Sequence, residues 1–257
     1  MGVVAALLDG RQAAATLRRT LPKAQHSTLV CRHPRQLVRT LEERLLDLVV
    51  IGPRAARAVD LPGLRSRFPR VPLVVFGPIR PDDAATVLEY DAERDASAVL
   101  VEGIDDPLLG EVVTRQSQTA RRIHALRDGP RALRLTEPLQ QSAWAELVRT
   151  AGKPLPTKTL AARLAVSREH LSRQFGAGGA PNLKRVMDFL RVVVARELAA
   201  NPGHDATSIG RVLGFSTPSH LRAVVRRVVG ATVGELPRLG VAELLRRFGR
   251  EGARSRR

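Results

Sequence analysis

The chain has 257 residues, enough for two domains, and because only 3% of them are aromatic its cores must be built from aliphatic side chains. Its net charge of +17 is unevenly spread, since residues 1–128 hold 19 Lys and Arg against 16 Asp and Glu, whereas residues 129–257 hold 23 against 9. A one-sided basic excess suits a polyanionic partner, although a preference for Arg over Lys is by itself what a GC-rich genome produces. The single cysteine, Cys31, argues against a disulfide framework or zinc cluster, and no apolar stretch approaches the ~18 residues of a membrane span.

Five short apolar runs alternate with helical patterns in the first half of the chain. The runs are rich in β-branched and aliphatic residues, which is typical of strands buried on both faces of a parallel sheet, and they span Val3–Leu8, Ser27–Cys31, Leu46–Ile51, Pro72–Phe76 and Ser97–Val101. The helical patterns span Arg11–Thr20, Pro34–Leu45, Leu61–Phe68, Asp82–Ala92 and Pro107–His124. This alternation predicts a flavodoxin-like α/β domain over residues 1–126, with a five-stranded parallel sheet.

The layout of this domain resembles a response-regulator receiver, but the residues that follow its strands do not. Receivers place an acidic cluster after the first strand, an acceptor Asp after the third, a Ser or Thr after the fourth and a Lys after the fifth. Here those places hold Asp9, Gly52, Gly77 and Glu102. We therefore expect a degenerate, or pseudo-receiver, domain that is not phosphorylated. The two glycines predict an open crevice at the strand ends, where a small-molecule effector is a hypothesis.

Breaker residues mark the end of this domain and the start of another. The cluster Arg127–Pro130 predicts that residues 127–137 form a linker. A helical pattern resumes at Pro138, with the single tryptophan, Trp144, as a core residue. A second domain is predicted over residues 138–240, and the basic, glycine-containing segment 241–257 is predicted to be a partly disordered extension.

Apolar spacing in Thr159–Phe175 predicts two short helices that meet at an angle, the arrangement of a helix-turn-helix unit. Ala161 supplies a small side chain where the helices approach, and Ser167 can cap the second helix. That helix, Arg168–Phe175, points Leu171 inward. Its exposed N-terminal residues are placed like those that reach base edges in the major groove.

The pattern recurs about 49 residues later. Gly210 takes the place of the small alanine, Gly214 lies in a turn where a positive φ is often required, and Ser216 or Thr217 can cap the following helix. Between the units, Asn182–Ala200 predicts one helix about 28 Å long, close to the ~34 Å between successive major-groove openings. The repeat predicts two recognition helices placed for adjacent grooves of DNA.

These stretches together resemble the DNA-binding domain of the AraC/XylS family of transcription regulators. The resemblance is carried by Thr159–Phe175, Arg191–Leu198 and Ser208–Leu221 (SIGRVLGFSTPSHL), with a weaker match over Gly230–Leu236. It implies an all-α domain of a bacterial regulator, with two helix-turn-helix units joined by a long helix.

The chain departs from the family pattern at several positions. Aliphatic residues replace the usual Phe at Leu221, Val225 and Val229, Ala180 replaces a Gly and Val233 replaces a Pro. Ala223 stands where family members often place a base-contacting Arg. The resemblance therefore implies weaker base readout by the second unit than by the first.

Nine exposed positions on the two predicted recognition helices are candidate DNA contacts: Arg168, Glu169, Ser172 and Arg173 in the first, and Ser219, His220, Arg222, Arg226 and Arg227 in the second. Arg173 can reach guanine with two hydrogen bonds, and Glu169 can accept one from a cytosine amino group. Arg226 and Arg227 are expected to contact phosphates, which position a protein without specifying sequence. Each of these residues also fits a solvated surface role.

The predicted function is that of a cytoplasmic, nucleoid-associated transcription regulator of double-stranded DNA. Its N-terminal domain would bind a second copy, a protein partner or a ligand, and no membrane partner is expected. Two alternatives stay open: a phosphorylation-controlled response regulator, and a sequence-indifferent nucleoid or RNA-binding protein. The sequence contains no nucleophile–base pair, metal cluster or phosphate loop, so we expect recognition only, with no enzyme activity, cofactor or metal.

Overall fold

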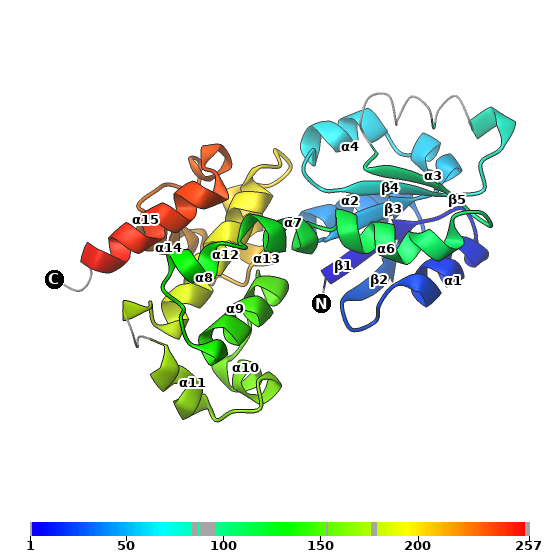
Figure 1. Cartoon of the computed structure of the whole chain (residues 1–257). Helices are drawn as coiled ribbons and strands as arrows, with labels where there is room; N and C mark the ends of the chain where they lie inside the picture. The colour runs from blue at the N-terminus through cyan, green and yellow to red at the C-terminus, as the bar shows by residue number, and fades with distance from the viewer. Residues whose placement is uncertain (1, 84–86, 88–95, 153, 176–178, 255–257) are drawn as a thin grey trace. The chain divides into compact units, whose positions relative to one another are not determined.

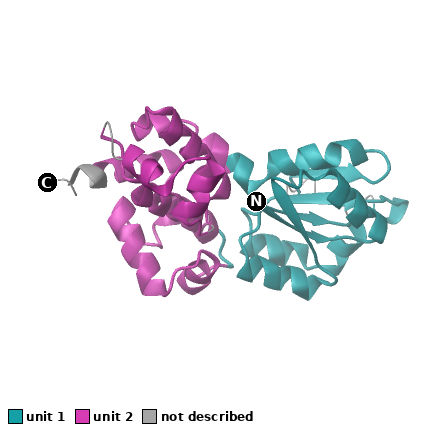
Figure 2. Ribbon diagram, turned by 90° about the horizontal axis from the view of Figure 1, so that it is seen from below, with its two compact units in different colours: residues 1–121, 201–203 teal, residues 122–200, 204–257 magenta. Residues whose placement is uncertain are grey.

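The computed structural model describes residues 2–83, 87, 96–152, 154–175 and 179–254 (Figure 1). These residues form two compact units, which Figure 2 shows in different colours. Unit 1 comprises residues 1–121 and 201–203, and unit 2 comprises residues 122–200 and 204–257. In the part of the chain that is described, no helix is long and apolar enough to cross a membrane.

Unit 1 is built on a five-stranded sheet in which every neighbouring pair is parallel. Its strands are β1 (Gly2–Leu7), β2 (His26–Val30), β3 (Leu48–Ile51), β4 (Leu73–Gly77) and β5 (Ala98–Val101), in the order β2-β1-β3-β4-β5. This is the flavodoxin-like order, which confirms the predicted fold class.

Side chains alternate between the two faces of this sheet and enter two hydrophobic clusters. One cluster contains Ala5, Val49 and Val75, and the other contains Ala6, Val50 and Val74. The strands are therefore apolar on both faces, as their continuous hydrophobic runs predicted.

Helices cover both faces of the sheet (Figure 1). They are α1 (Arg11–Thr20), α2 (Pro34–Glu43), α3 (Pro53–Ala58), α4 (Leu61–Arg67) and α6 (Asp106–Gln116). Helix α7 (Gln118–Ala125) follows α6 in the chain. The helix predicted over Asp82–Ala92 falls mostly outside the described residues. The one predicted over Pro107–His124 is broken at Ser117, whose hydroxyl donates to the carbonyl of Thr114 and accepts from the N–H of Ala120. Such local bonds compete with the helical ladder.

Unit 2 is helical. Its elements are α8 (Gly129–Ala132), α9 (Pro138–Thr150), α10 (Thr157–Arg163), α11 (Arg168–Gln174), α12 (Leu183–Ala199), α13 (Ala206–Val212), α14 (Pro218–Val229), the 3-10 turn η2 (Leu236–Arg238) and α15 (Val241–Arg254). The long helix α12 lies at the centre, with nine buried residues. It contacts α9, α13, α14 and α15.

The predicted linker and extension differ from what the structure shows. The division between units falls inside α7, and the region expected as a linker contains α8 and the buried Leu133 and Leu135. Arg122 is tied to α12 by two hydrogen bonds to Glu197, at 2.9 and 2.7 Å. Residues 127–137 are therefore folded into unit 2 rather than serving as a linker.

The segment after residue 240 is likewise part of the core. Within α15, Leu244 and Phe248 are buried, and the Phe248 ring stacks on Phe189 with the centroids 4.7 Å apart. Phe189 in turn faces Trp144, at 6.5 Å. The expectation of a partly disordered extension is corrected over Val241–Arg254, because apolar residues on one side of this basic helix cover aromatic rings.

Candidate DNA-binding surface and strand-end site

Asp9, the one acidic residue left from the receiver pattern, is held by the start of α3. Its carboxylate accepts hydrogen bonds from the backbone N–H groups of Arg54 and Ala55, at 3.0 and 2.7 Å. The first N–H groups of a helix have no partner within the helix, so this carboxylate stabilises α3 as a cap would.

The two glycines at the strand ends allow the side chains of Asp9 and Pro53 to approach the backbone closely, and they do not leave open space. A Cβ on Gly52 would lie 2.6 Å from the carboxylate carbon of Asp9, and one on Gly77 would lie 2.8 Å from Cδ of Pro53. The space that a side chain would enter is therefore filled by Asp9 and Pro53. The prediction of an open crevice beside these glycines is wrong.

Glu102, where receivers have Lys, adds negative charge to the same end of the sheet. Its partial burial raises the pKa of this carboxyl, and repulsion from Asp106 and Asp9 raises it further. A receiver needs a cation here to balance the phosphoryl group, so the charge at this position has the opposite sign to the one required.

The two helix-turn-helix units share one turn geometry. In the first, Ala165 takes the left-handed conformation (φ 54°) and the N–H of Val166 donates to the carbonyl of Ala161 at 3.1 Å. In the second, Gly214 takes that conformation (φ 68°) and the N–H of Phe215 donates to Gly210 at 2.8 Å. Since the same bond closes both turns, the repeat seen in the sequence is also a repeat of backbone structure.

Side-chain caps start both recognition helices. The Ser167 hydroxyl accepts from the N–H of His170 at 3.1 Å, and the Thr217 hydroxyl accepts from the N–H of His220 at 3.0 Å. Of the two possible caps in the second unit, Thr217 therefore has this role. Ser216 instead lies 3.0 Å from Nδ1 of His220.

Arg191 of α12 fixes the second turn, a role that the sequence analysis missed. Its guanidinium lies 3.7 Å from the ring centroid of Phe215 and donates to the carbonyls of Leu213 and Gly214, at 3.1 and 3.3 Å. Burial lowers the pKa of this group, and nearby Asp188 opposes that shift. Its place in the stretch RVVVAREL, which carried the family resemblance, was the available indication.

The first recognition helix, α11, presents all four of its candidate contacts to solvent: Arg168, Glu169, Ser172 and Arg173. Leu171 is fully buried on the other side. Among the described residues, no carboxylate lies within ion-pair distance of Arg168 or Arg173. The helix thus combines hydrogen-bonding groups of both kinds on one short exposed face.

The second recognition helix, α14, exposes Ser219, His220, Arg222, Arg226 and Arg227. Two of these residues are engaged within unit 2. The ring of His220 meets Phe215 edge-on at 5.4 Å, and Arg227 donates to Asp188 at 2.8 Å. Within the described part of the chain, Arg222 and Arg226 have no carboxylate at ion-pair distance. Arg222 and Arg226 can therefore bind an anion without breaking an ion pair within the described part of the chain.

Comparison with known proteins adds a family assignment for this region. Residues 160–238 match a family model described as a helix-turn-helix domain. No curated protein matched the chain. Among solved structures, the chain is similar to full-length FixJ from B. japonicum, with 14% identity, coverage of 72% of this chain and 94% of that chain, and a TM-score of 0.37.

The matched segment holds both closed turns, both capped recognition helices and the helix that joins them. Residues 160–238 therefore match a helix-turn-helix domain of the AraC type, and this domain supports a role for the chain in DNA binding and transcription regulation.

Proposed function

We propose that this protein is a sequence-specific regulator whose two helix-turn-helix units contact different parts of the DNA. The first unit contacts base edges, and the second mainly contacts phosphates. The observation that carries this proposal is the contrast between α11, which exposes Arg168, Glu169, Ser172 and Arg173, and α14, which exposes Ala223 between two arginines.

The chemistry of α11 suits direct readout. Arg173 can donate two hydrogen bonds to the O6 and N7 atoms of guanine, Glu169 can accept one from cytosine, and Ser172 can do either. Glu169 also lies in the first turn of its helix, where the helix dipole favours a negative charge. The donors and acceptors on this face differ, so base pairs that present different patterns can be distinguished.

The chemistry of α14 suits the phosphate backbone. Arg222 and Arg226 are one helical turn apart, so both lie on one face of the helix and can approach neighbouring phosphates. Ala223, between them, has no hydrogen-bonding group. Arg227 is paired with Asp188 and contributes less positive charge to that face than its exposure suggests.

Selection of DNA ligands from a random library with the whole chain tests this division. We expect one motif, and we expect Arg173→Ala to relax it at one or two positions, at a cost of about 1–3 kcal/mol for the preferred base. Arg226→Ala should weaken binding to all DNA sequences alike. It should also reduce the slope of the logarithm of the binding constant against the logarithm of the salt concentration by the amount expected for about one phosphate contact.

Arg35→Ala is the matched control, because Arg35 is exposed on α2 of unit 1. It should change neither the motif nor the salt slope. Recovery of unrelated sequences with a steep salt slope would contradict sequence-specific binding and favour a sequence-indifferent nucleic-acid-binding protein.

We further propose that aspartyl phosphorylation does not control this regulator. The glycine at the acceptor position, the engagement of Asp9 by α3 and the negative charge of Glu102 all support this proposal. Incubation with acetyl phosphate and Mg²⁺ should leave the intact mass unchanged. An acid-stable, base-labile phosphoryl adduct on an aspartate would contradict it.

Unit 1 would then act through a protein partner or a second copy of the chain, in a cytoplasmic protein associated with the nucleoid. Ile104 and Leu108, close to the end of β5, have exposures of 75% and 52%, which is high for large apolar residues. Light scattering on the chain with Ile104→Ser and Leu108→Ser should show loss of any oligomer that depends on this surface. An unchanged oligomer would place the contact elsewhere.

A further inference from the structure

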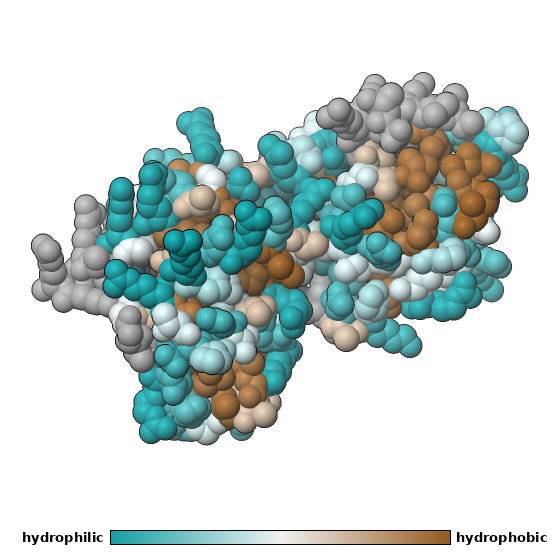
Figure 3. Space-filling model, in the orientation of Figure 1, coloured by the Kyte–Doolittle hydropathy of each residue, from teal (hydrophilic) through white to brown (hydrophobic). Residues whose placement is uncertain are grey.

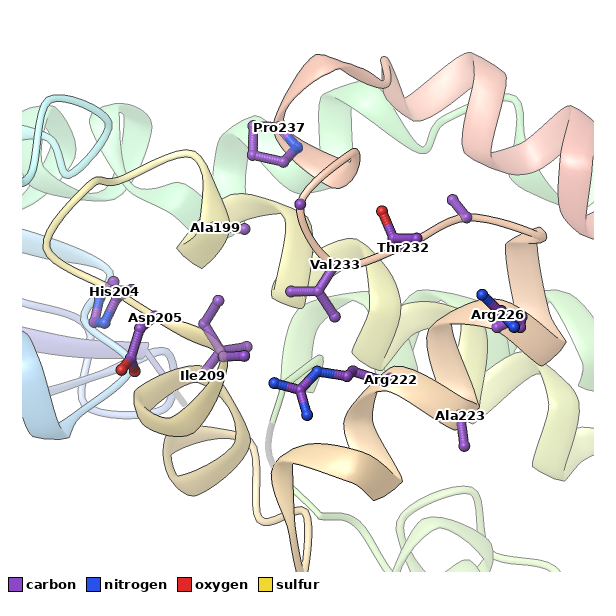
Figure 4. Close-up of a pocket in the computed structure, with 13 residues that line it drawn as sticks. Ala199, His204, Asp205, Ile209, Arg222, Ala223, Arg226, Thr232, Val233 and Pro237 are labelled. Carbon is purple, nitrogen blue, oxygen red and sulfur yellow. The ribbon is translucent and has the colours of Figure 1, made fainter.

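A cavity of about 920 Å³ lies within unit 2, beside the second recognition helix. Its walls come from α13, α14 and the segment 231–237, and Ala199 of α12 also lines it (Figure 4). A pocket of this size is at the upper end of the range that binds small organic molecules in proteins.

The cavity is large because its lining side chains are small. Five of its thirteen lining residues are alanine or glycine: Ala199, Ala206, Ala223, Ala231 and Gly234. A Cβ on Gly234 would meet no atom within 4 Å. Ala223 is also the residue that stands where the AraC resemblance expects arginine, so this departure both removes a base contact and leaves space on α14.

The other lining residues give the cavity an apolar wall, a cationic wall and an acidic group. Ile209, Val233 and Pro237 contribute aliphatic surface, whereas Arg222 and Arg226 line the cavity from α14. Figure 4 shows Asp205 and Arg226 on opposite sides of the cavity. Hydrogen bonds from Ser208 lower the pKa of Asp205, which keeps that side negative at neutral pH. An anionic group is therefore favoured at the arginines and disfavoured at the start of α13.

We propose that this cavity binds an organic anion with an apolar body and a single carboxylate or phosphate head group, and that this ligand competes with DNA. The apolar body would lie against Ile209 and Val233, and the head group would lie between Arg222 and Arg226. The competition rests on the proposed function, because the same arginines are assigned there to phosphates. One pair of guanidinium groups neutralises either the ligand or the DNA backbone.

Calorimetric titration of the whole chain with sodium decanoate, below its micelle concentration and without DNA, tests the site itself. We expect saturable binding of one decanoate. Decanol lacks the charge and inorganic phosphate lacks the apolar body, so the affinity of each should be lower than that of decanoate by at least about tenfold. Phosphate binding as tight as that of decanoate would show that the arginines bind any anion without help from the apolar walls, which would contradict the proposal. An absence of decanoate binding would also overturn it.

Two variants fill the cavity without touching its arginines. Ala206→Leu and Gly234→Leu should each weaken decanoate binding about tenfold, while the Kd for DNA stays within about twofold. Ala162→Leu makes the same change on the exposed face of α10, outside the cavity, and should leave both affinities unchanged. Decanoate affinities that are equal in the wild type and in both filled variants would overturn the site.

A DNA competition experiment separates this inference from the proposed function. With decanoate at ten times its Kd, the apparent Kd for the selected DNA should rise about elevenfold by mass action. Decanoate that binds without changing DNA affinity overturns the competition. Decanoate that binds to a chain for which selection finds no motif supports the site and contradicts the proposed function.

Discussion

The carboxylate of Asp9 occupies the place where a side chain on residue 52 would begin, because a Cβ on Gly52 would lie 2.6 Å from its carboxylate carbon. In a receiver both positions are acidic. Here the first acidic group has turned to the N–H groups of α3, and the absence of a side chain at the second makes that contact possible.

Gly52→Asp should therefore not restore a phosphorylation site. Overpacking against Asp9 and the repulsion of two carboxylates should lower the free energy of unfolding by about 1–3 kcal/mol. Urea unfolding measures the change. Gly10→Ala is the control, since a Cβ there would meet no atom within 4 Å. A Gly52→Asp chain as stable as the wild type and labelled by acetyl phosphate would refute this prediction.

The stability of the chain should respond unequally to exchange of the left-handed residues in the two turns. Gly214→Ala should cost about 1–2 kcal/mol, because L-residues are strained at that φ and the new Cβ would lie 3.0 Å from Cγ of Pro154. Ala165→Gly relieves strain but adds freedom to the unfolded chain, so the net change should be within about 0.5 kcal/mol. Urea unfolding measures both changes, and equal losses in the two variants would contradict this prediction.

The stack of Trp144, Phe189 and Phe248 should be a main contribution to the stability of unit 2. Phe248→Ala removes a buried ring and should cost about 3–5 kcal/mol. Arg250→Ala, on the exposed side of α15, should change stability by no more than about 0.5 kcal/mol. The fluorescence of Trp144, the only tryptophan, follows the unfolding of this unit directly.

The cap of α13 predicts a dependence on pH. Asp205 accepts from the N–H of Ser208 at 2.7 Å, and hydrogen bonds from Ser208 lower the pKa of its carboxyl. A lowered folded-state pKa gives stability that is present above the ordinary range near pH 4 and is lost as the pH falls through the folded value. Asp205→Ala should cost about 1 kcal/mol at pH 7, and the difference should shrink below pH ~4. Asp205→Asn, which keeps an acceptor, should show the smaller loss at pH 7.

Ala223→Arg should change the second unit from phosphate binding toward base readout. Selection with this variant should extend the motif, with about 1–3 kcal/mol of discrimination at the added position. The longer side chain should also reduce the space for decanoate. Ala162→Arg adds the same charge on α10, so an extended motif with that control would indicate a nonspecific effect of charge.

Elements with a local cause were predictable from the sequence. The strands follow from runs such as Leu46–Ile51, which contains β3, and the second turn follows from Gly214 and the cap after it. Helix α3 was missed because its six residues lack apolar periodicity and its first N–H groups are satisfied by Asp9, which is 45 residues away. The break at Ser117 was missed because one hydroxyl there competes with an otherwise helical pattern.

The candidate DNA contacts could be chosen from the sequence because helix periodicity identifies exposed positions. The sequence does not show which of these residues contact other residues of the chain. The pairing of Arg227 with Asp188 depends on how α12 and α14 cross, and the packing of His220 on Phe215 depends on the conformation of the turn before α14. The cavity was equally hidden, because five small residues that line it come from separate parts of the chain.

Helix α15 lies beyond the residues that match the family, yet its Phe248 covers the ring of Phe189. A fragment cut at residue 238 would lose Phe248 and leave the face of the Phe189 ring that it covers open to water. Such a fragment should precipitate at low salt with nucleic acid and aggregate without it. The boundary for expressing this domain is therefore set by an aromatic contact and not by the extent of sequence similarity.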